Sequence, residues 1–305
     1  MASVLRQAAR LASSRCLTQL SAASSTSRLG ASSYYFSPSS RNASTSSTIK
    51  VQLDSNTGVA MMMFQNPPVN SMSLDFMTEF VIAWDKLELD KSCRGIILTS
   101  ALPNVFSAGL DIMDMYGTTP EHRTAFWKAL QELWLKVYGS GKIVVAAING
   151  ASPAGGCLMA LSCDYRIMID NPKYKIGINE TKLGIVAPFW FKDCLENTVG
   201  YRMSEMSVQY GILYNSAEAL KIGLVDQLVP EDKLISTATE TMIKWFAIPD
   251  YARQISKAMV RKATMDKMLA GREADITNFV TFTNKDSIQK SLGMYMEMLK
   301  GRKAK

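Results

Sequence analysis

The stretch IVVAAINGASPAGGCLMALSC, residues 143–163, contains no charged residue and indicates how the chain folds. Ile143–Ile148 has the unbroken apolar composition of a strand that is buried on both faces. Asn149-Gly150 and Ser152-Pro153 are turn signals, and Gly155-Gly156 opens a second apolar run that suits a buried helix. The same turn signals argue against a membrane-spanning helix, which the uncharged length alone would allow. We therefore predict a strand, a loop and a helix here, and no transmembrane segment.

Segments on both sides of this stretch alternate between strand and helix patterns. Strands are predicted at Lys50–Leu53, Val59–Phe64, Gly95–Ser100, Tyr165–Ile169, Tyr174–Ile178 and Leu224–Val229. Helices are predicted at Ser71–Asp90, Pro120–Tyr138, from Gly155 through Leu161, at Asn215–Ile222, and from Pro230 onward with breaks near Pro249 and Gly271. This alternation favours a layered, largely parallel α/β architecture that is followed by a helical tail.

The first fifty residues differ in composition from the rest of the chain. They contain six basic residues, fifteen serines and no acidic residue. Such a basic, Ser-rich start is typical of a mitochondrial transit peptide, although a disordered tail has a similar composition. These residues also supply six of the seven net positive charges. The remainder is nearly neutral, so the basic charge of the full chain is only weak evidence for nucleic-acid binding.

The cysteines and the single histidine disfavour several chemistries. The five cysteines include no C-x-x-C pair, which argues against zinc and redox motifs. His122 lies in a polar helix start, so a nucleophile paired with histidine is disfavoured. Gly150–Ala154 departs from the G-x-S-x-G elbow at its last position. The chain has no Walker loop and no G-x-G-x-x-G after a strand. We expect neither a metal nor a cofactor.

Two glycine-marked loops and one carboxylate remain as candidate chemistry. Ser107–Asp111 follows a strand and Pro153–Cys157 opens a helix, so backbone N–H groups in both could hold a developing oxyanion. Either loop alone is equally compatible with a simple tight turn. Glu180 lies among apolar residues and glycines, where partial desolvation would raise its proton affinity toward that of a general base. A solvated loop glutamate is the alternative.

Together, these segments resemble the crotonase (enoyl-CoA hydratase/isomerase) superfamily over residues 50–300. The segments that carry the resemblance are FSAGLD (106–111), NGASPAGGC (149–157) and AEALKIGLVD (217–226). Three more are similar to the isomerase branch of that family: NPPVNS (66–71), GINETKLG (177–184) and APFW (187–190). The resemblance implies a crotonase-like α/β fold of repeated ββα units with a C-terminal helical trimerisation region.

Composition and resemblance together predict a domain organisation, a cellular location and the binding partners. A mitochondrial transit peptide would occupy residues 1–42, a crotonase-like catalytic core residues 43–245, and a C-terminal helical region residues 246–305. The protein would be a homotrimer of the mitochondrial matrix. It would bind a fatty enoyl-CoA, and it would have no nucleic-acid partner.

Roles for individual residues follow from the same resemblance. Glu180 would be the catalytic acid and base, and the N–H groups of Ala108 and Gly155 would form the oxyanion hole. The implied substrate-binding residues are Ala108, Gly109, Leu110, Asp111, Ile112, Gly155 and Asn179. CoA would enter as part of the substrate.

Leu158 stands where hydratases of this family carry a second glutamate. Adding water to a double bond needs one group to activate water and a second group to handle the other proton, whereas moving a double bond needs a single base. The resemblance therefore implies isomerisation of cis- or trans-3-enoyl-CoA to trans-2-enoyl-CoA in the β-oxidation of unsaturated fatty acids. The alternatives are enoyl-CoA hydration, another crotonase-type reaction on acyl-CoA, or a non-catalytic RNA-binding protein with this fold.

Overall fold

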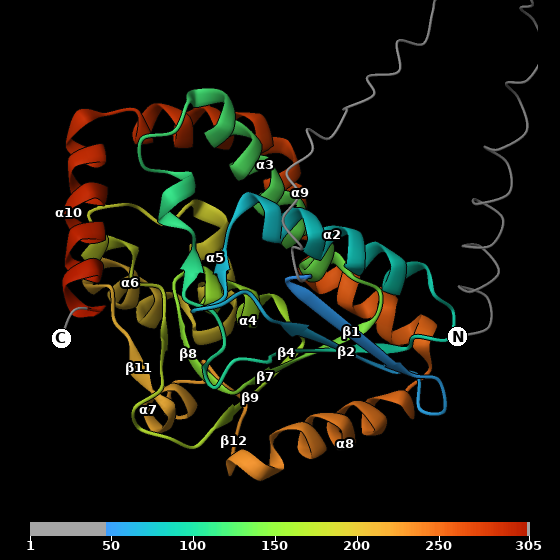
Figure 1. Cartoon of the computed structure of the whole chain (residues 1–305). Helices are drawn as coiled ribbons and strands as arrows, with labels where there is room; N and C mark the ends of the chain where they lie inside the picture. Colours follow the sequence, from blue (N-terminus) through green and yellow to red (C-terminus); the bar gives the residue numbers. More distant parts are fainter. Residues whose placement is uncertain (1–46, 304–305) are drawn as a thin grey trace, which may run out of the picture. The chain divides into compact units, whose positions relative to one another are not determined.

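A computed structural model describes residues 47–303 of the chain (Figure 1). The predicted transit peptide, residues 1–42, lies outside the described residues. The described residues form one unit. Within this unit, helix α8 (Leu234–Phe246) ends and helix α9 (Asp250–Thr283) begins close to the predicted boundary of the C-terminal region. The three predicted domain ranges themselves stay predictions.

The larger sheet has six strands in the order β1-β2-β4-β7-β9-β12, and all neighbours are parallel except β1 and β2. Its strands are β1 (Ile49–Asp54), β2 (Val59–Phe64), β4 (Gly95–Ser100), β7 (Ile143–Ile148), β9 (Tyr165–Ile169) and β12 (Gln227–Val229). Every residue of β4 and β7 is buried, as their unbroken apolar runs predicted. Strand β12 begins at Gln227 and not at the predicted Leu224, because the N–H of Leu224 donates to the carbonyl of Ala219 in the preceding helix.

Two smaller sheets arrange the loops around the candidate site. One has the order β11-β10-β8-β5 and the other pairs β3 with β6. Their strands are β3 (Ser71–Met72), β5 (Asn104–Val105), β6 (Gly109–Leu110), β8 (Gly150–Pro153), β10 (Lys175–Gly177) and β11 (Tyr214–Asn215). Most of these strands were not predicted. Two to four residues are too few for a sequence period to be recognised.

Helices cover both faces of the larger sheet. In Figure 1, α2 (Leu74–Leu89) and α3 (Pro120–Gly139) lie over one face and α8 lies over the other. Ser73 caps α2 by accepting a hydrogen bond from the N–H of Phe76. Asn70 fixes the connector of residues 66–70, since its side-chain oxygen accepts a hydrogen bond from the N–H of Asn66. Its side-chain amide also donates to the hydroxyl of Ser100 and to the carbonyl of Phe106.

The remaining helices are short and surround the loops. They are α4 (Gly155–Ser162), α5 (Phe189–Val199), α6 (Tyr201–Tyr210), α7 (Ser216–Lys221) and the 3₁₀ turns η1 (Ile112–Asp114), η2 (Glu180–Leu183) and η3 (Glu231–Lys233). None of the described helices is long and apolar enough to cross a membrane.

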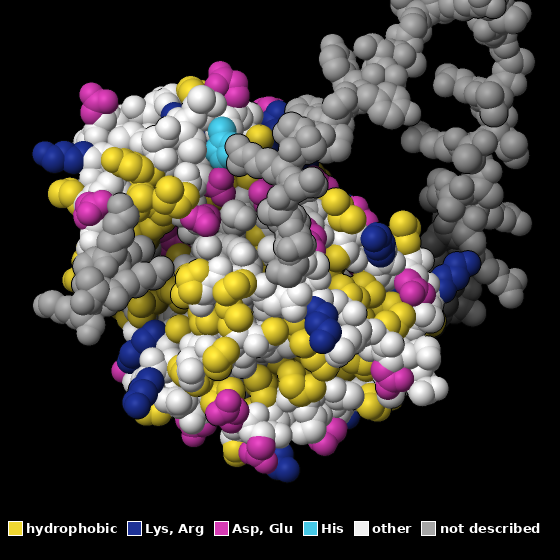
Figure 2. Space-filling view, viewed as in Figure 1, with side chains coloured by type: hydrophobic (Ala, Val, Ile, Leu, Met, Phe, Trp, Pro, Cys, Tyr) yellow, Lys and Arg dark blue, Asp and Glu magenta, His cyan; other side chains and the backbone are white. Residues whose placement is uncertain are grey.

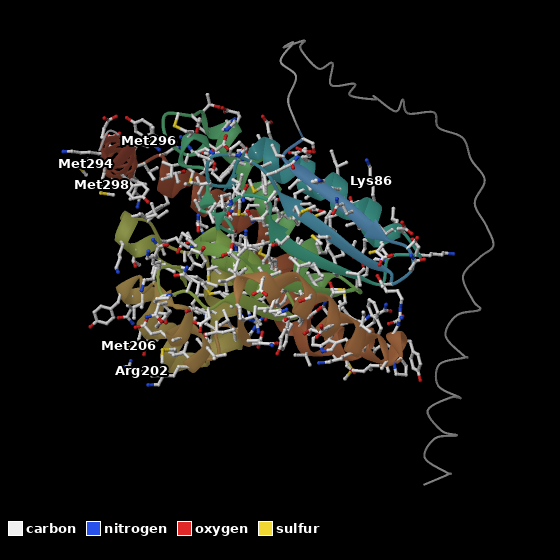
Figure 3. The ribbon with its side chains drawn as sticks, turned by 60° about the horizontal axis from the view of Figure 1, so that its bottom comes forward. Lys86, Arg202, Met206, Met294, Met296 and Met298 are labelled. Atoms are coloured by element: carbon white, nitrogen blue, oxygen red, sulfur yellow. The ribbon has the colours of Figure 1, made fainter. Side chains whose placement is uncertain are left out.

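The helical tail consists of α9 and α10 (Asp286–Lys303). The predicted break near Pro249 is confirmed, but the break near Gly271 is wrong. A single glycine costs a helix only about 1 kcal/mol, and α9 continues through Gly271 for 34 residues in all. Figure 3 marks α10 by its outer residues Met294, Met296 and Met298. This helix packs against η2, the turn that carries Glu180.

Candidate active site

Glu180 is the first residue of η2 and follows directly after β10. Its side chain is 5% exposed, and burial raises the pKa of its carboxyl to about 7. The backbone N–H groups of Glu180 and Asn179 oppose this shift more weakly. Neither carboxylate oxygen has a hydrogen-bond partner of normal geometry within residues 47–298. The group is therefore ready to exchange a proton near neutral pH, and the alternative of a solvated loop glutamate is wrong.

Glu180 lines an enclosed apolar cavity. The other residues that line it are Leu110, Met115, Trp127, Ile185, Val186, Pro188, Phe191, Phe279, Phe282 and Thr283. Its volume is about 30 Å³, room for about a single water molecule. On its other side Glu180 borders an open hollow of about 420 Å³, which Val186 also lines. A long apolar ligand that enters the enclosed cavity therefore requires part of the cavity wall to move.

The cavity-lining residue Leu110 has a backbone N–H group that lies close to Gly155. A methyl group placed on Gly155 would lie 3.3 Å from the nitrogen of Leu110. The N–H of Asp111 donates to the carbonyl of Met72 in β3, at 3.2 Å. Because N–H directions alternate along a strand, the N–H of Leu110 is directed away from β3. The N–H of Gly155 belongs to the first turn of α4, which has no side-chain cap. Leu110 and Gly155 can thus donate to one oxygen.

The predicted oxyanion donor Ala108 has a different role. Its N–H already donates to the carbonyl of Val69, at 2.9 Å. The loop can be picked out from the sequence, but which of its N–H groups are used by the fold cannot. The nearby Ser107 holds the loop, since its hydroxyl donates to the carbonyl of Asn70 and accepts from the N–H of Gly109.

The other predicted substrate-binding residues fall into two groups. Asp111 is occupied structurally: its carboxylate caps η1 through the N–H of Met113 and accepts from the hydroxyl of Ser71. Ile112, the first residue of η1, packs against the core. Asn179 directly precedes Glu180, and its buried Oδ1 has no hydrogen-bond partner in the described part of the chain. It remains free to meet a ligand.

Ala154 lies in the predicted loop Pro153–Cys157, but its backbone conformation was not predicted from the sequence. Its φ of 52° lies in the left-handed region, which costs an ordinary residue about 1–3 kcal/mol. The N–H of Ala154 donates to the carbonyl of Gly177, at 2.8 Å. This bond ties the start of α4 to the strand that leads to Glu180, and so it connects the candidate oxyanion donors to the candidate base.

The remaining candidate groups take no part in this arrangement. His122 lies at the surface (Figure 2), and its Nε2 is 2.7 Å from Asp114 Oδ1. Burial, assisted by nearby Glu180, raises the pKa of the Cys157 thiol, so this cysteine is not a nucleophile at neutral pH. No group of three or more His, Cys, Asp or Glu residues suited to a metal occurs among the described residues.

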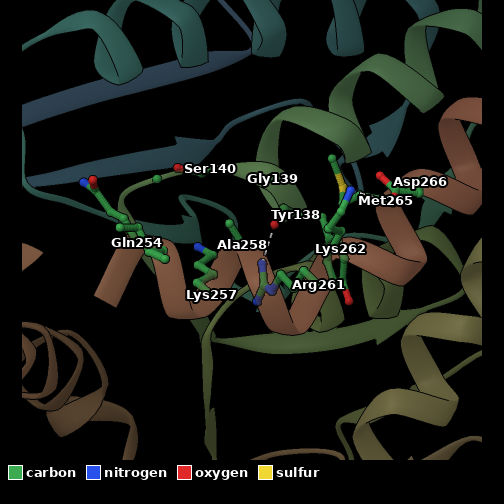
Figure 4. Close-up of a pocket in the computed structure, with 12 residues that line it drawn as sticks. Tyr138, Gly139, Ser140, Gln254, Lys257, Ala258, Arg261, Lys262, Met265 and Asp266 are labelled. Atoms are coloured by element: carbon green, nitrogen blue, oxygen red, sulfur yellow. Dashed lines mark hydrogen bonds and ion pairs between the residues drawn. The ribbon is translucent and has the colours of Figure 1, made fainter. Parts of the chain in front are cut away.

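A groove of about 540 Å³ lies between the end of α3 and the first half of α9 (Figure 4). Its cationic residues are already paired, because Lys257 and Arg261 both bind Asp164 at 2.8 Å. Arg261 also donates to the carbonyl of Tyr138 and lies over the ring of that residue. Asp164 therefore has a structural role, and the residues that line the groove include no free acid or base in a catalytic arrangement.

Known proteins resemble the chain over nearly all described residues. The family described as enoyl-CoA hydratase/isomerase matches residues 54–303. "Enoyl-CoA delta isomerase 1, mitochondrial" from Homo sapiens is 59% identical over 258 residues, which are 85% of each chain. The Rattus norvegicus protein of that name is 60% identical over 84% of this chain and 88% of its own. The crystal structure of human mitochondrial delta3-delta2-enoyl-CoA isomerase matches with a TM-score of 0.83 and 59% identity, over 84% of this chain and 99% of that one.

Proposed function

The chain belongs to the enoyl-CoA hydratase/isomerase family, and from this premise we propose that it converts 3-enoyl-CoA to trans-2-enoyl-CoA. It has the crotonase-like α/β fold with a C-terminal helical region. Relatives at about 60% identity are named mitochondrial enoyl-CoA delta isomerases, so this chain is an isomerase of the same mitochondrial type. Its place is in the β-oxidation of unsaturated fatty acids, in the matrix.

The observation that carries this proposal is that a single acid serves the site. Glu180 is the only carboxylate among the residues that line the cavity and the adjoining hollow. Leu158, at the position that would hold a second acid in a hydratase, is 1% exposed on α4. One base suffices to move a double bond, because the proton that it removes is the proton that it returns.

In the proposed mechanism, Glu180 removes a proton from C2 of the 3-enoyl thioester. The electron pair of that C–H bond delocalises onto the thioester oxygen, and the double bond shifts toward C2. The N–H groups of Leu110 and Gly155 stabilise this oxyanion; removing one such donor typically costs about 10²–10³ in kcat. Protonated Glu180 then delivers the proton to C4 and becomes a carboxylate again. Leu110 here replaces Ala108, whose N–H is engaged with Val69.

The proposal includes the substrate contacts and the assembly. Gly109, Leu110, Gly155 and Asn179 would contact the acyl-CoA, and the proton transfer itself needs no added cofactor. α9 exposes an apolar stripe that suits a second copy of the chain. Its members and their exposed fractions are Tyr251 71%, Ile255 58%, Met259 71% and Val260 84%. This stripe supports the proposed homotrimer.

The proposal is tested by the absorbance of the conjugated enoyl thioester. Purified protein is mixed with 3-enoyl-CoA and, separately, with 2-enoyl-CoA. A rise with the first substrate and no change with the second is expected. Loss of absorbance with 2-enoyl-CoA would indicate hydration, and no change with either substrate would contradict an acyl-CoA activity.

A further inference from the structure

Trp127 lies in the wall between the enclosed cavity of Glu180 and an open groove of about 540 Å³ at the surface. Five residues line both the cavity and the groove: Trp127, Val186, Pro188, Phe279 and Phe282. These five side chains form a partition. A ligand that starts at Glu180 and is longer than the cavity must cross this partition to reach the groove.

Trp127 is the most firmly held member of the partition. Its indole N–H donates to Asp275 Oδ2 at 2.7 Å, and its ring stacks on Phe279 with centroids 3.7 Å apart. The side chain is 3% exposed. By contrast, Val186 and Pro188 lie in the irregular segment between η2 and α5, and Val186 is 69% exposed. The partition thus has a fixed side and a side that can give way.

Asp275 holds this fixed side in place. The same Oδ2 that accepts from Trp127 also accepts from Gln131 Nε2 at 2.8 Å and from Trp190 Nε1 at 3.1 Å. Asp275 is 8% exposed, and no Lys, Arg or His in the described part of the chain forms an ion pair with it. Three neutral donors from α3 and α5 therefore converge on one carboxylate of α9. This arrangement leaves the Trp127 indole a single orientation.

We propose that Trp127 sets the acyl-chain length that the enzyme accepts, and that Asp275 is the positioning residue that fixes the Trp127 ring. The inference rests on the proposed isomerase function. An acyl chain that ends before Trp127 fits once the cavity widens slightly. A longer chain must displace the segment around Val186 and pass along Trp127 into the groove. Shortening the Trp127 side chain removes the fixed barrier and favours longer substrates.

The test compares kcat/KM for 3-enoyl-CoA substrates with acyl chains of six, ten and fourteen carbons. Trp127→Leu is expected to raise the ratio of kcat/KM for the longest over the shortest substrate about tenfold, within the range that a few methylene contacts provide. Trp134→Leu is the matched control. This substitution removes another buried indole of α3. The Trp134 indole bonds to Cys194 and lines neither the cavity nor the groove, so the ratio of kcat/KM values should stay that of the wild type.

Asp275 is tested by two substitutions. Asp275→Asn keeps an oxygen that can accept from the indole and should preserve the wild-type chain-length profile. Asp275→Leu releases the ring and should shift the profile in the same direction as Trp127→Leu. A purely structural role would lower kcat/KM equally for all lengths in both variants. If Trp127→Leu does not fold, as judged by its thermal melting, Trp127→Phe retains an aromatic side chain and is measured instead.

The outcomes separate this inference from the proposed function. If the wild type isomerises no 3-enoyl-CoA of any length, the proposed function fails. If the wild type is active but Trp127→Leu or Trp127→Phe keeps the wild-type ratio within about twofold, the inference about Trp127 is overturned while the function stands. If the ratio moves in the Trp127 variant but equally in Trp134→Leu, the effect is a general loosening of the core, and the inference is again overturned.

Discussion

Gly109 and Gly155 lie so close together that a methyl group on Gly109 would be 2.9 Å from the nitrogen of Gly155. Gly109 also has a φ of 89°, a conformation that side-chain-bearing residues rarely adopt. The close approach and the positive φ explain why position 109 is a glycine. Because the two loops come this close, the N–H groups of Leu110 and Gly155, which belong to separate elements, can donate to one oxygen.

Gly155→Ala is expected to lower kcat about 100-fold, the usual effect of losing one oxyanion donor. The added methyl group would lie 3.3 Å from the Leu110 nitrogen, in the space that the substrate oxygen needs. Steady-state kinetics and thermal melting measure the effect on activity and on stability. Gly271→Ala is the control, since its methyl group would make an ordinary contact with Phe189 in the middle of α9. A wild-type kcat for Gly155→Ala would contradict the oxyanion assignment.

Glu180→Gln is expected to lower kcat by at least about 10³-fold, because a neutral amide cannot take the C2 proton. The substitution keeps the size of the side chain, so binding of the enoyl-CoA should persist and is measured by calorimetry. Glu240→Gln, on the exposed part of α8, is the matched control and should have wild-type activity. Near-normal turnover by Glu180→Gln would exclude Glu180 as the base.

The pH dependence of kcat/KM should report the same carboxyl. Burial raises the pKa of Glu180 to about 7, and only the deprotonated form acts as a base. We expect kcat/KM to fall as the pH drops through about 7 and to level off above it. The residual activity of Glu180→Gln should lack this dependence. A wild-type profile that is flat between pH 5 and pH 8 would show that another group accepts the proton.

Stability should change with pH in the opposite direction. The pKa of Glu180 is about 7 in the folded protein and 4.5 without the fold, so the folded state binds the proton more tightly. Folding therefore loses stability as the pH rises from about 4.5 to about 7, by up to about 3 kcal/mol at higher pH. Glu180→Gln removes this contribution. Urea unfolding at pH 5 and pH 8 should show a smaller loss between the two pH values for the variant than for the wild type.

The sequence was most informative where a feature is local. β4 and β7 were predicted at their observed bounds because an unbroken apolar run identifies a buried strand by itself. Glu180 was a candidate from its neighbours, but only the packing of η2 under α10 and beside the cavity settles its burial. The break expected at Gly271 failed because the contacts of a long helix outweigh the small penalty of one glycine.

Features that depend on distant pairing could not be predicted. We propose Leu110 rather than Ala108 as an oxyanion donor because the Val69 carbonyl and β3 engage the N–H groups of Ala108 and Asp111. Nothing in the residue type of Ala154 indicates a left-handed φ. The bond between Trp127 and Asp275 joins residues 148 positions apart. Each of these features follows from how segments meet in the folded chain, which a local pattern does not encode.

The ion cluster around Asp164 gives a last prediction, and it concerns stability. Asp164 has a side chain that is 7% exposed, and it binds Lys257 and Arg261 at 2.8 Å each. It thereby attaches α9 to the sheet. Asp164→Asn preserves the shape but leaves two largely buried cations without a counter-charge. The free energy of unfolding should fall by about 3–5 kcal/mol, as is typical when one partner of a buried pair is removed.

Urea unfolding and kinetics together test the Asp164 prediction. Asp232→Asn is the control, since Asp232 is 72% exposed and its pair with Lys233 should contribute less than about 1 kcal/mol. Lys257 and Arg261 of this cluster line the groove between α3 and α9, which does not include Glu180. The molecules of Asp164→Asn that remain folded should therefore keep wild-type kcat/KM for a short substrate. A loss of kcat without a loss of stability would instead connect this cluster to the chemistry and contradict its structural assignment.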